Sequence, residues 1–578
     1  MSKTYSHNTT DKQASSSSLN KTIAPFGAWP PEINSTLFTA NTVKFNEPQL
    51  DHGNCYWLEQ RPEEKGRGVV VCQTINNGIK GERYDLTPAN VNVRTKAHEY
   101  GGGCYKVSGD TVYFVNADDQ RVYRMPVDQS NEPIALSPES NEKTRYRYAD
   151  FFVDHEREQL ICICEIYRLE SAEPESNIIS LRLDGSSTIG FNVLVFGNDF
   201  YSNPSVSPDG EKLTWLTWNH PNMPWDNSEC WIADFNSMNM LHKHRKVAGG
   251  KGTANTEDKG ESVFQPQWSP TGDLLFVSDR NNWWNIYSYN TYNKYTEALV
   301  DMPAEFATPQ WVFGMSTYGF LNSYTLFCTY ASEGQSHFAT IDLMSKSFTP
   351  LDLPFTLAEG IACQDDDDTA LFIGASFTSL PEIIRWKKDS WQSIAKSSDL
   401  TMATESISMP QAIHFTNSSE QTVHGFFYPP MHQNYQGETD SKPPLIVMCH
   451  GGPTGSTNPS FNLKAQYWTN RGFAVFDVNY SGSTGYGRAY RRRLYKQWGV
   501  ADVDDLCKGA EYLIEQGWVD SNKIAIRGNS AGGYSVLAAL TFHDTFTAGA
   551  SLYGVGDLSA LTEDTHKFES RYCDQLIG

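Results

Sequence analysis

A serine in a glycine-rich pentapeptide is the side chain of this sequence best placed to do covalent chemistry. Residues 528–532 read Gly-Asn-Ser-Ala-Gly, which matches G-x-S-x-G with Ser530 at the centre. The β-forming run KIAI precedes the pentapeptide, and the helix-forming run YSVLAAL follows it. A strand, a sharp turn and a helix in that order expose a serine hydroxyl as a nucleophile. The pattern therefore predicts that Ser530 is a catalytic nucleophile.

The small residues around Ser530 have a mechanical reason. A residue at the tip of such a turn adopts a strained backbone conformation, and a Cβ atom at Gly528 or Gly532 would clash across the turn. The N-terminus of the following helix directs its N–H groups toward developing negative charge. A glycine-rich helix start with a capping serine would also fit these five residues, but the preceding strand favours the nucleophile.

A second glycine motif supplies hydrogen-bond donors. His450, Gly451, Gly452 and Pro453 directly follow the apolar run LIVM. A glycine lets its backbone N–H approach the oxyanion of a tetrahedral intermediate, and one such donor is worth about 3–4 kcal/mol. We therefore predict an oxyanion hole formed by the N–H groups of Gly452 and Ala531. The general base of such sites normally follows the serine in the chain, so we expect His450 to orient the loop.

Two further segments lie close to these motifs in the sequence. The loop NYSGSTGYG (479–487) follows the next apolar strand, and Tyr480 or Tyr486 in it would line the substrate site. Plain turn structure explains the glycines of this loop equally well. The basic run Arg491–Arg493 is expected to be a solvated helix face rather than a clamp for a carboxylate.

Short apolar strands that alternate with amphipathic segments position these motifs. The strands PLIVMC (444–449) and GFAVFDVNY (472–480) are largely apolar, and VDDLCKGAEYLIEQ (503–516) has helical periodicity. Such strands belong to a parallel sheet that helices cover on both faces. We predict a three-layer α/β domain of the α/β-hydrolase type over residues 406–578, with a β-hairpin near its start.

Residues 46–405 contain repeated β-forming segments separated by turn signals. SPDGEKLTWLT (207–217) recurs as SPTGDLLFVSD (269–279), and in both the proline and glycine set a tight turn before an alternating strand. About seven such units fill the region, close to the ~40–50 residues of a four-stranded propeller blade. We predict a β-propeller of seven blades; a set of unrelated hairpins is the alternative.

Composition excludes several classes of function. The chain has 68 acidic and 46 basic residues, a net charge of −22, which repels nucleic-acid phosphates and anionic lipid. No stretch approaches the ~18 apolar residues of a membrane span. The eleven cysteines are scattered without a CxxC pair or His/Cys cluster, so we expect buried thiols in a cytoplasmic protein that uses no metal or other cofactor. Residues 1–45, polar at their start, are expected to be a lead-in segment.

The motifs together resemble a known family. HGGPTG, NYSGSTGYGR, QWGVADVDD and RGNSAGGY, in this order and spacing, are similar to the prolyl oligopeptidase family of serine peptidases, in particular its bacterial dipeptidyl- and acylaminoacyl-peptidase branch. HEYGGG (98–103) and WNHPNMPWD (218–226) resemble the propeller of that branch. The resemblance, which covers about residues 24–578, implies hydrolysis of peptide bonds through an acyl-enzyme. It also implies a propeller that admits short peptides and excludes folded proteins.

The family further implies an Asp and a His far downstream of the serine. Only 48 residues follow Ser530, and a βαβ unit needs ~30 or more, so we expect both residues beyond residue 578 of a longer protein. The residues present are poor substitutes. His543 lies about three turns down the helix, His566 falls in a connecting segment, and Asp557 after the strand AGASLYG is the best carboxylate.

Two other functions remain open. A carboxylesterase would use the same elbow, although the propeller favours peptides, and a non-catalytic propeller scaffold with a degenerate hydrolase domain is disfavoured by the intact elbow. Among peptidases, the oligopeptidase, dipeptidyl and acylaminoacyl types all fit. Dipeptidyl activity requires an acidic anchor for the free amino terminus, and Glu99 in HEYGGG is one candidate, although a glutamate there would also brace a blade.

Overall fold

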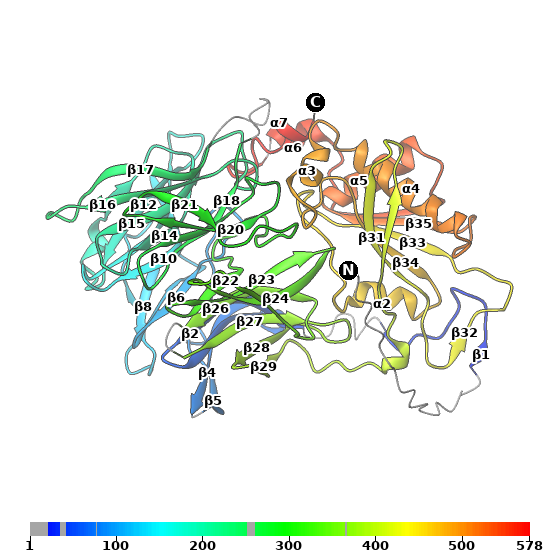
Figure 1. The fold of residues 1–578 in the computed structure, drawn as a ribbon, viewed down its shortest axis with the longest axis horizontal. Coiled ribbons are helices and arrows are strands. Elements are labelled where there is room, and N and C mark those ends of the chain that lie inside the picture. Colours follow the sequence, from blue (N-terminus) through cyan, green and yellow to red (C-terminus); the bar gives the residue numbers. More distant parts are fainter. Residues whose placement is uncertain are drawn as a thin grey trace, which may run out of the picture.

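The computed structural model describes residues 21–34, 42–76, 78–250, 260–364, 367–563 and 565–577. Most of the expected lead-in, residues 1–20 and 35–41, lies outside these ranges. The chain forms a propeller, blue to green in Figure 1, beside an α/β part drawn in yellow to red.

Seven four-stranded antiparallel sheets form the propeller, and each consists of four consecutive strands. The predicted fold and blade count are therefore confirmed. The strands are β2 (Lys44–Asp51), β3 (Asn54–Arg61), β4 (Arg67–Asn76) and β5 (Ile79–Asp85); β6 (Tyr105–Ser108), β7 (Thr111–Val115), β8 (Val122–Pro126) and β9 (Ile134–Ala135); β10 (Thr144–Asp154), β11 (Gln159–Arg168), β12 (Glu175–Arg182) and β13 (Asn192–Val195); β14 (Phe200–Val206), β15 (Lys212–Trp218), β16 (Glu229–Phe235) and β17 (Leu241–Gly249); β18 (Val263–Trp268), β19 (Leu274–Ser278), β20 (Asn285–Asn290) and β21 (Tyr295–Ala298); β22 (Tyr318–Asn322), β23 (Thr325–Ser332), β24 (Gln335–Asp342) and β25 (Phe348–Leu351); and β26 (Leu357–Gln364), β27 (Thr369–Ala375), β28 (Glu382–Lys387) and β29 (Ser390–Lys396).

The two repeated sequences form the same turn in neighbouring blades. Gly210 has φ +70° and donates its N–H to Ser207 O at 2.8 Å, between β14 and β15. Gly272 has φ +95° and donates to Ser269 O at 3.0 Å, between β18 and β19. Glycine adopts this left-handed conformation without steric cost, which explains the shared Ser-Pro-x-Gly pattern.

The first and last blades meet through apolar packing. Phe45 and Trp57 of the first blade form one buried cluster with Leu371 and Ile383 of the last. Because each blade is built from consecutive strands, no strand is exchanged between these two sheets among the described residues. Side-chain burial, rather than a shared sheet, therefore closes the ring.

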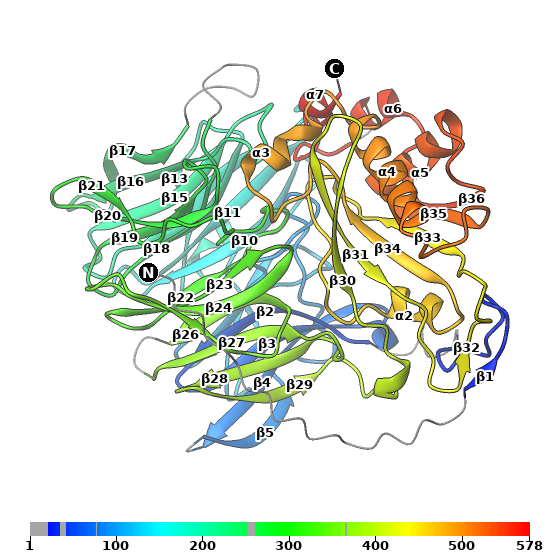
Figure 2. The same cartoon turned by 45° about the vertical axis from the view of Figure 1, so that its right-hand side comes forward.

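The α/β part is built on a six-stranded sheet in the order β30-β31-β34-β33-β35-β36. β30 and β31 form the predicted hairpin, and the last four strands run parallel. Figure 2 shows these strands beside α4 and α5. The elements are β30 (Gln411–Thr416), β31 (Thr422–Tyr428), β33 (Leu445–Cys449), β34 (Ala474–Asn479), β35 (Ile524–Asn529), β36 (Ala548–Leu552), α2 (Leu463–Thr469), α3 (Arg488–Arg491), α4 (Ala501–Glu515), α5 (Ala531–Phe542), α6 (Leu558–Glu563) and α7 (Cys573–Leu576).

Shorter elements complete the described chain. β1 (Thr22–Ile23) pairs in parallel with β32 (Tyr435–Gln436), so the described N-terminal residues contact the α/β part. The 3-10 helices are η1 (Pro62–Glu64), η2 (Ser186–Ile189), η3 (Thr404–Ser406) and η4 (Arg492–Leu494). Within the described ranges, no helix has both the length and the apolar character needed to cross a bilayer.

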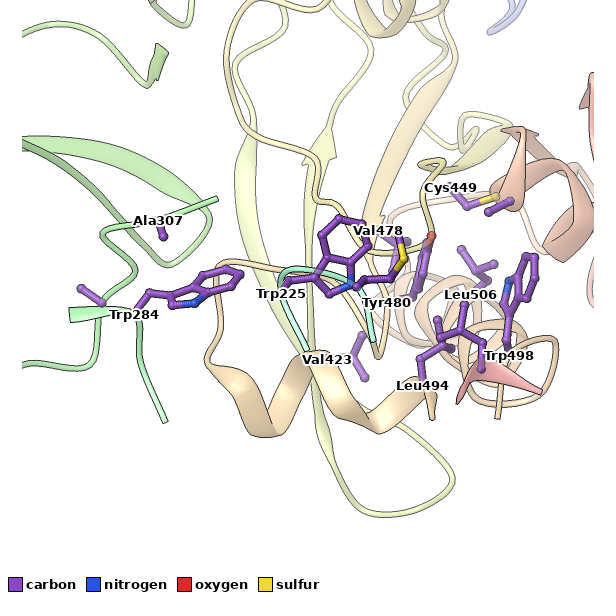
Figure 3. Packing of buried hydrophobic residues seen from close by; sticks show 14 of the residues in the cluster. Trp225, Trp284, Ala307, Val423, Cys449, Val478, Tyr480, Leu494, Trp498 and Leu506 are labelled. Carbon is purple, nitrogen blue, oxygen red and sulfur yellow. The ribbon is translucent and has the colours of Figure 1, made fainter. Parts of the chain in front are cut away.

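One hydrophobic cluster runs across the boundary between the two parts. Figure 3 shows Trp225 of the propeller beside Tyr480 of the α/β part, with Trp284 on the propeller side of Trp225 and Leu494 on the other side; all four belong to one cluster. All four side chains are at most 2% exposed. The propeller and the α/β part therefore share a core rather than meeting at a polar surface.

The basic run Arg491–Arg493 does not form the expected solvated helix face. Arg491 is 2% exposed, donates to Asp279 Oδ2 at 2.7 Å and lies 4.1 Å from the centre of the Trp284 ring. Asp279 is fully buried and also pairs with Arg488. The prediction was wrong because the partner carboxylate is supplied by the propeller, which a local sequence pattern does not reveal.

We expect this buried ion pair to hold the two parts together. Asp279→Ala removes the carboxylate that pairs with two guanidinium groups, and breaking a buried pair in this way costs about 3–5 kcal/mol. Urea denaturation followed by tryptophan fluorescence measures the loss. The matched control is Glu297→Ala, which removes the partner of Lys346 from an exposed pair and should cost at most about 1 kcal/mol. Equal effects of the two variants would contradict the role of Asp279.

Candidate active site

Ser530 occupies the turn between β35 and α5. Its backbone has φ +52° and ψ −122°, a conformation that costs a non-glycine residue about 1–3 kcal/mol. Its N–H donates to Leu552 O of β36 at 3.1 Å, and its carbonyl accepts from Gly533 N–H at 2.9 Å. The turn is therefore held by the neighbouring strand on one side and by the first helical turn on the other.

The two glycines of the pentapeptide are in contact with backbone. A methyl group on Gly528 would lie 2.3 Å from Gly532 O. A methyl group on Gly532 would lie 2.5 Å from Cys449 O and 2.6 Å from His450 O. Only hydrogen fits at either position, as the sequence predicted, and this allows the elbow to pack directly against the end of β33.

The loop after β33 lies over the elbow. A methyl group on Gly451 would be 3.2 Å from Asn529 O and 3.4 Å from Ser530 Cβ, so the loop packs closely on the elbow. Gly452 has φ +129° and precedes a cis peptide bond to Pro453. Within the described chain, neither the Gly452 N–H nor the Ala531 N–H donates to another protein group. Both donors of the predicted oxyanion hole are therefore free to bind a ligand oxygen.

His450 is locked into this loop. Its Nδ1 lies 2.8 Å from Gly451 O, and its Nε2 lies 2.8 Å from Ser483 Oγ. The carbonyl must accept, so Nδ1 carries the proton and Nε2 accepts from the Ser483 hydroxyl. Burial lowers the pKa of His450 to about 4. With both ring nitrogens engaged, His450 orients the loop, and it is not available to take a proton from Ser530.

Tyr480 supports His450 and does not face a substrate. Its ring stacks on the imidazole with centroids 4.3 Å apart, its hydroxyl donates to His450 O at 2.9 Å, and the residue is 0% exposed. The predicted substrate contact therefore does not fit its position. Tyr486 is half-buried and stacks on His424 with centroids 4.1 Å apart; a substrate contact by Tyr486 stays a prediction.

Residues of the propeller and of the α/β part both hold the end of the loop His450–Thr454, here called the glycine loop. Thr454 donates its N–H to Tyr572 Oη at 3.0 Å, and the Tyr572 hydroxyl donates to Thr454 Oγ1 at 2.6 Å. Trp311 of the propeller donates its indole N–H to Thr454 O at 2.7 Å. The loop that carries Gly452 is thereby fixed against the propeller.

The remaining titratable candidates have other partners. His543 is exposed and caps the far end of α5. His566 pairs with Glu569 at 3.4 Å and lies in edge contact with Tyr100. Asp557 accepts the N–H groups of Ser559 and Ala560 and so caps α6. Within the described ranges, no group is hydrogen-bonded to the Ser530 hydroxyl.

An acidic corner lies between the propeller and the segment before α7. Glu99 forms an ion pair with Arg147, whereas Glu569 accepts a hydrogen bond from the Tyr100 hydroxyl at 2.9 Å. Burial raises the pKa of Glu569, and within the described chain no lysine or arginine is paired with it. Tyr100 also contacts Trp311 with centroids 5.6 Å apart, which connects this corner to the glycine loop.

Sequence reasoning selected Glu99 and missed Glu569. The available signal was the spacing of Glu569 three residues after His566, which places both on one side of a turn. The contact with Tyr100 joins residues 469 positions apart, so only the folded chain reveals it.

Three comparisons with known proteins agree with this geometry. Residues 459–578 match the model of the prolyl oligopeptidase family. A solved puromycin-hydrolyzing peptidase from Mycobacterium tuberculosis has 33% identity and a TM-score of 0.88, over 96% of this chain and 84% of that one. Dipeptidyl aminopeptidase BIII of Pseudoxanthomonas mexicana is 33% identical over 144 residues, 25% of this chain and 21% of that protein.

A third relative has a different printed activity. Acylamino-acid-releasing enzyme 1 of Oryza sativa subsp. japonica is 27% identical over 226 residues, 35% of this chain and 28% of that enzyme. The chain thus aligns with less than a third of the length of each of these two curated relatives.

We expect the close packing at Gly532 to control the reactivity of Ser530. In Gly532→Ala the new methyl group meets two carbonyl oxygens, and such overpacking costs about 1–3 kcal/mol or more. Displacement of the elbow should slow modification of Ser530 by a fluorophosphonate at least tenfold. The control is Gly556→Ala, where a methyl group meets nothing within 4 Å. Unchanged modification of Gly532→Ala would show that the contact does not position the serine.

Proposed function

The chain belongs to the prolyl oligopeptidase family of serine peptidases, and on this basis we propose that it hydrolyses short peptides through an acyl-enzyme on Ser530. The observation that carries the proposal is the strained Ser530 turn, with φ +52°, beneath two backbone N–H groups that have no protein acceptor among the described residues. That combination serves acyl transfer, because it presents a nucleophile and a site for the oxyanion together.

Each part of the site has a role in this reaction. The Ser530 hydroxyl attacks the scissile carbonyl carbon, and the carbonyl oxygen becomes an oxyanion that accepts from Gly452 and Ala531 N–H. The positive N-terminal end of the α5 helix dipole also stabilises the oxyanion. His450 and Tyr480 keep the Gly452 loop in place without touching the substrate. The hydroxyl proton is not assigned to any described histidine.

We further propose that the substrate carries a free amino terminus. A peptide ammonium group would fit the acidic corner, where Glu569 lacks a permanent cation and Glu99 is already neutralised by Arg147. The printed name of the Pseudoxanthomonas relative, a dipeptidyl aminopeptidase, supports this choice. The rice relative releases acylated amino acids by its printed name, and an apolar anchor would suit that activity instead.

Two further expectations concern which substrates reach the site and which cellular compartment holds the protein. A propeller beside the site would exclude folded proteins, and the net charge of −22 disfavours nucleic acids and anionic membranes as partners. All eleven cysteines are free thiols, which supports a reducing compartment such as the cytoplasm.

The first test is covalent labelling of the complete natural protein. A fluorophosphonate probe should modify Ser530, and Ser530→Ala should abolish both labelling and hydrolysis of short chromogenic peptides, because the acyl-enzyme no longer forms. Ser521→Ala, which removes an exposed serine just before β35, is the control and should keep both. Mass spectrometry locates the adduct.

The same assays on the complete natural protein distinguish the alternative functions. Turnover of small esters without turnover of any short peptide would identify a carboxylesterase. Absence of labelling and of turnover in the complete protein would favour a non-catalytic scaffold. Labelling retained in Ser530→Ala would place the nucleophile elsewhere.

A second test concerns the amino terminus of the substrate. Glu569→Gln removes the charge that binds the ammonium group, and loss of a charged hydrogen bond of about 1.5–3 kcal/mol should lower kcat/KM for free-amino peptides ten- to hundredfold. N-acetylated versions of the same peptides should be unaffected. Glu99→Gln, which releases Arg147, should have the smaller effect.

The pH dependence gives an independent check of this role. Only the ionised carboxylate attracts an ammonium group, and burial raises the pKa of Glu569. KM for free-amino peptides should therefore rise as the pH falls through a range above that of an ordinary glutamate, and Glu569→Gln should remove this rise. A preference for acetylated peptides would instead assign the acylaminoacyl type.

A further inference from the structure

Two histidines face each other across the hairpin that begins the α/β part. His414 of β30 and His424 of β31 are directly opposite in the register. Their Nδ1 atoms lie 2.8 Å apart, and the rings are nearly perpendicular, at 85°. His414 is exposed and His424 is half-buried, so solvent reaches the pair from one side. Neither residue has a role in the proposed hydrolysis.

The geometry leaves one proton between two ring nitrogens. Two neutral imidazoles at this separation share a single Nδ1–H, which one ring donates to the lone pair of the other. A neutral imidazole nitrogen is a good ligand for copper, zinc and nickel ions.

We propose that His414 and His424 chelate a divalent transition-metal ion through their Nδ1 atoms, with water completing the coordination. Two nitrogens at the usual 2.0–2.1 Å from a metal and about 90° apart stand roughly 2.8–3.0 Å from each other, which matches their present separation. When the metal binds, the ring that donated its Nδ1–H changes tautomer. Its Nδ1 loses a proton and its Nε2 takes one up, so both neutral rings then carry Nε2–H with no net release of protons.

The number of protein ligands decides which metal ion this site should prefer. No group of three or more His, Cys, Asp or Glu side chains suited to a metal occurs in the part of the chain that the structure describes. A two-nitrogen chelate open to water suits Cu²⁺ best, because Cu²⁺ binds nitrogen ligands more tightly than Zn²⁺ or Ni²⁺ and favours ligands at right angles. We therefore expect the order Cu²⁺ first, then Ni²⁺ and Zn²⁺.

The neighbours of the pair affect the bound ion in opposite ways. Tyr486 stacks on the His424 ring with centroids 4.1 Å apart, and its hydroxyl oxygen accepts a hydrogen bond from the Asn479 side-chain amide at 3.0 Å. These contacts fix the tyrosine ring in its present orientation. Arg493 is the nearby cation that acts on His424. It repels a metal ion, so its removal should tighten binding.

The test is titration of the complete protein with Cu²⁺, followed by calorimetry and by electron paramagnetic resonance. The tightest site should show hyperfine coupling to two imidazole nitrogens. His414→Ala and His424→Ala should each weaken this site at least tenfold, because each leaves one ligand. Arg493→Gln should strengthen it about two- to tenfold.

The matched control is His543→Ala, which removes an exposed histidine at the end of α5 and should leave the tightest site unchanged. His414 is exposed, so His414→Ala should fold normally, and its unfolding midpoint without metal verifies this. Equal Cu²⁺ affinity in His414→Ala and the unchanged protein would overturn the proposal. A tightest site that keeps only one nitrogen ligand would also overturn it.

Discussion

The candidate site depends on a contact between two stretches of bare backbone. The first turn of α5 rests on the carbonyl oxygens at the end of β33, and only a hydrogen at Gly532 leaves room for it. A residue with positive φ such as Ser530 persists only where its surroundings hold it in place. Here the surroundings are the β36 carbonyl beside its N–H and the glycine loop above its side chain.

That glycine loop is in turn held by groups from the propeller. Trp311 binds the carbonyl of Thr454, and Glu305 accepts the N–H groups of Trp284 and Gly487 at 2.8 and 2.9 Å. Burial raises the pKa of Glu305 to about 6, against the opposing effect of Arg491. The propeller therefore does more than cover the site, because it supplies hydrogen bonds to two loops of the α/β part, one at Thr454 and one at Gly487.

The sequence predicts well where the causes are local. The Ser530 turn, the Ser-Pro-x-Gly turns and the β30–β31 hairpin each depend on residues a few positions apart, and each formed as expected. The seven blades were predictable for the same reason, since every sheet consists of consecutive strands.

Prediction failed where the interacting residue is distant in the sequence, or where the direction of a side chain decides its role. Arg491 was assigned to solvent because Asp279, 212 positions away, is invisible to a local pattern. Tyr480 was one of two candidates for a substrate contact, with plain turn structure as the alternative, because the spacing of residues in the loop does not reveal which way the ring points. Glu569 was not selected because its hydrogen bond with Tyr100 and its lack of a lysine or arginine partner among the described residues are properties of the folded chain.

The way the ring closes also has a consequence for synthesis on the ribosome. Trp57 and Phe45 are buried by the last blade, and a hydrogen bond from Gly53 to Gln364 spans 311 positions at the same junction. Until β27 and β28 have been translated, one flank of the first blade has no neighbour and exposes these aromatic side chains to water. Such transiently exposed apolar surface promotes association between nascent chains. We therefore expect this junction to be where a chaperone helps most.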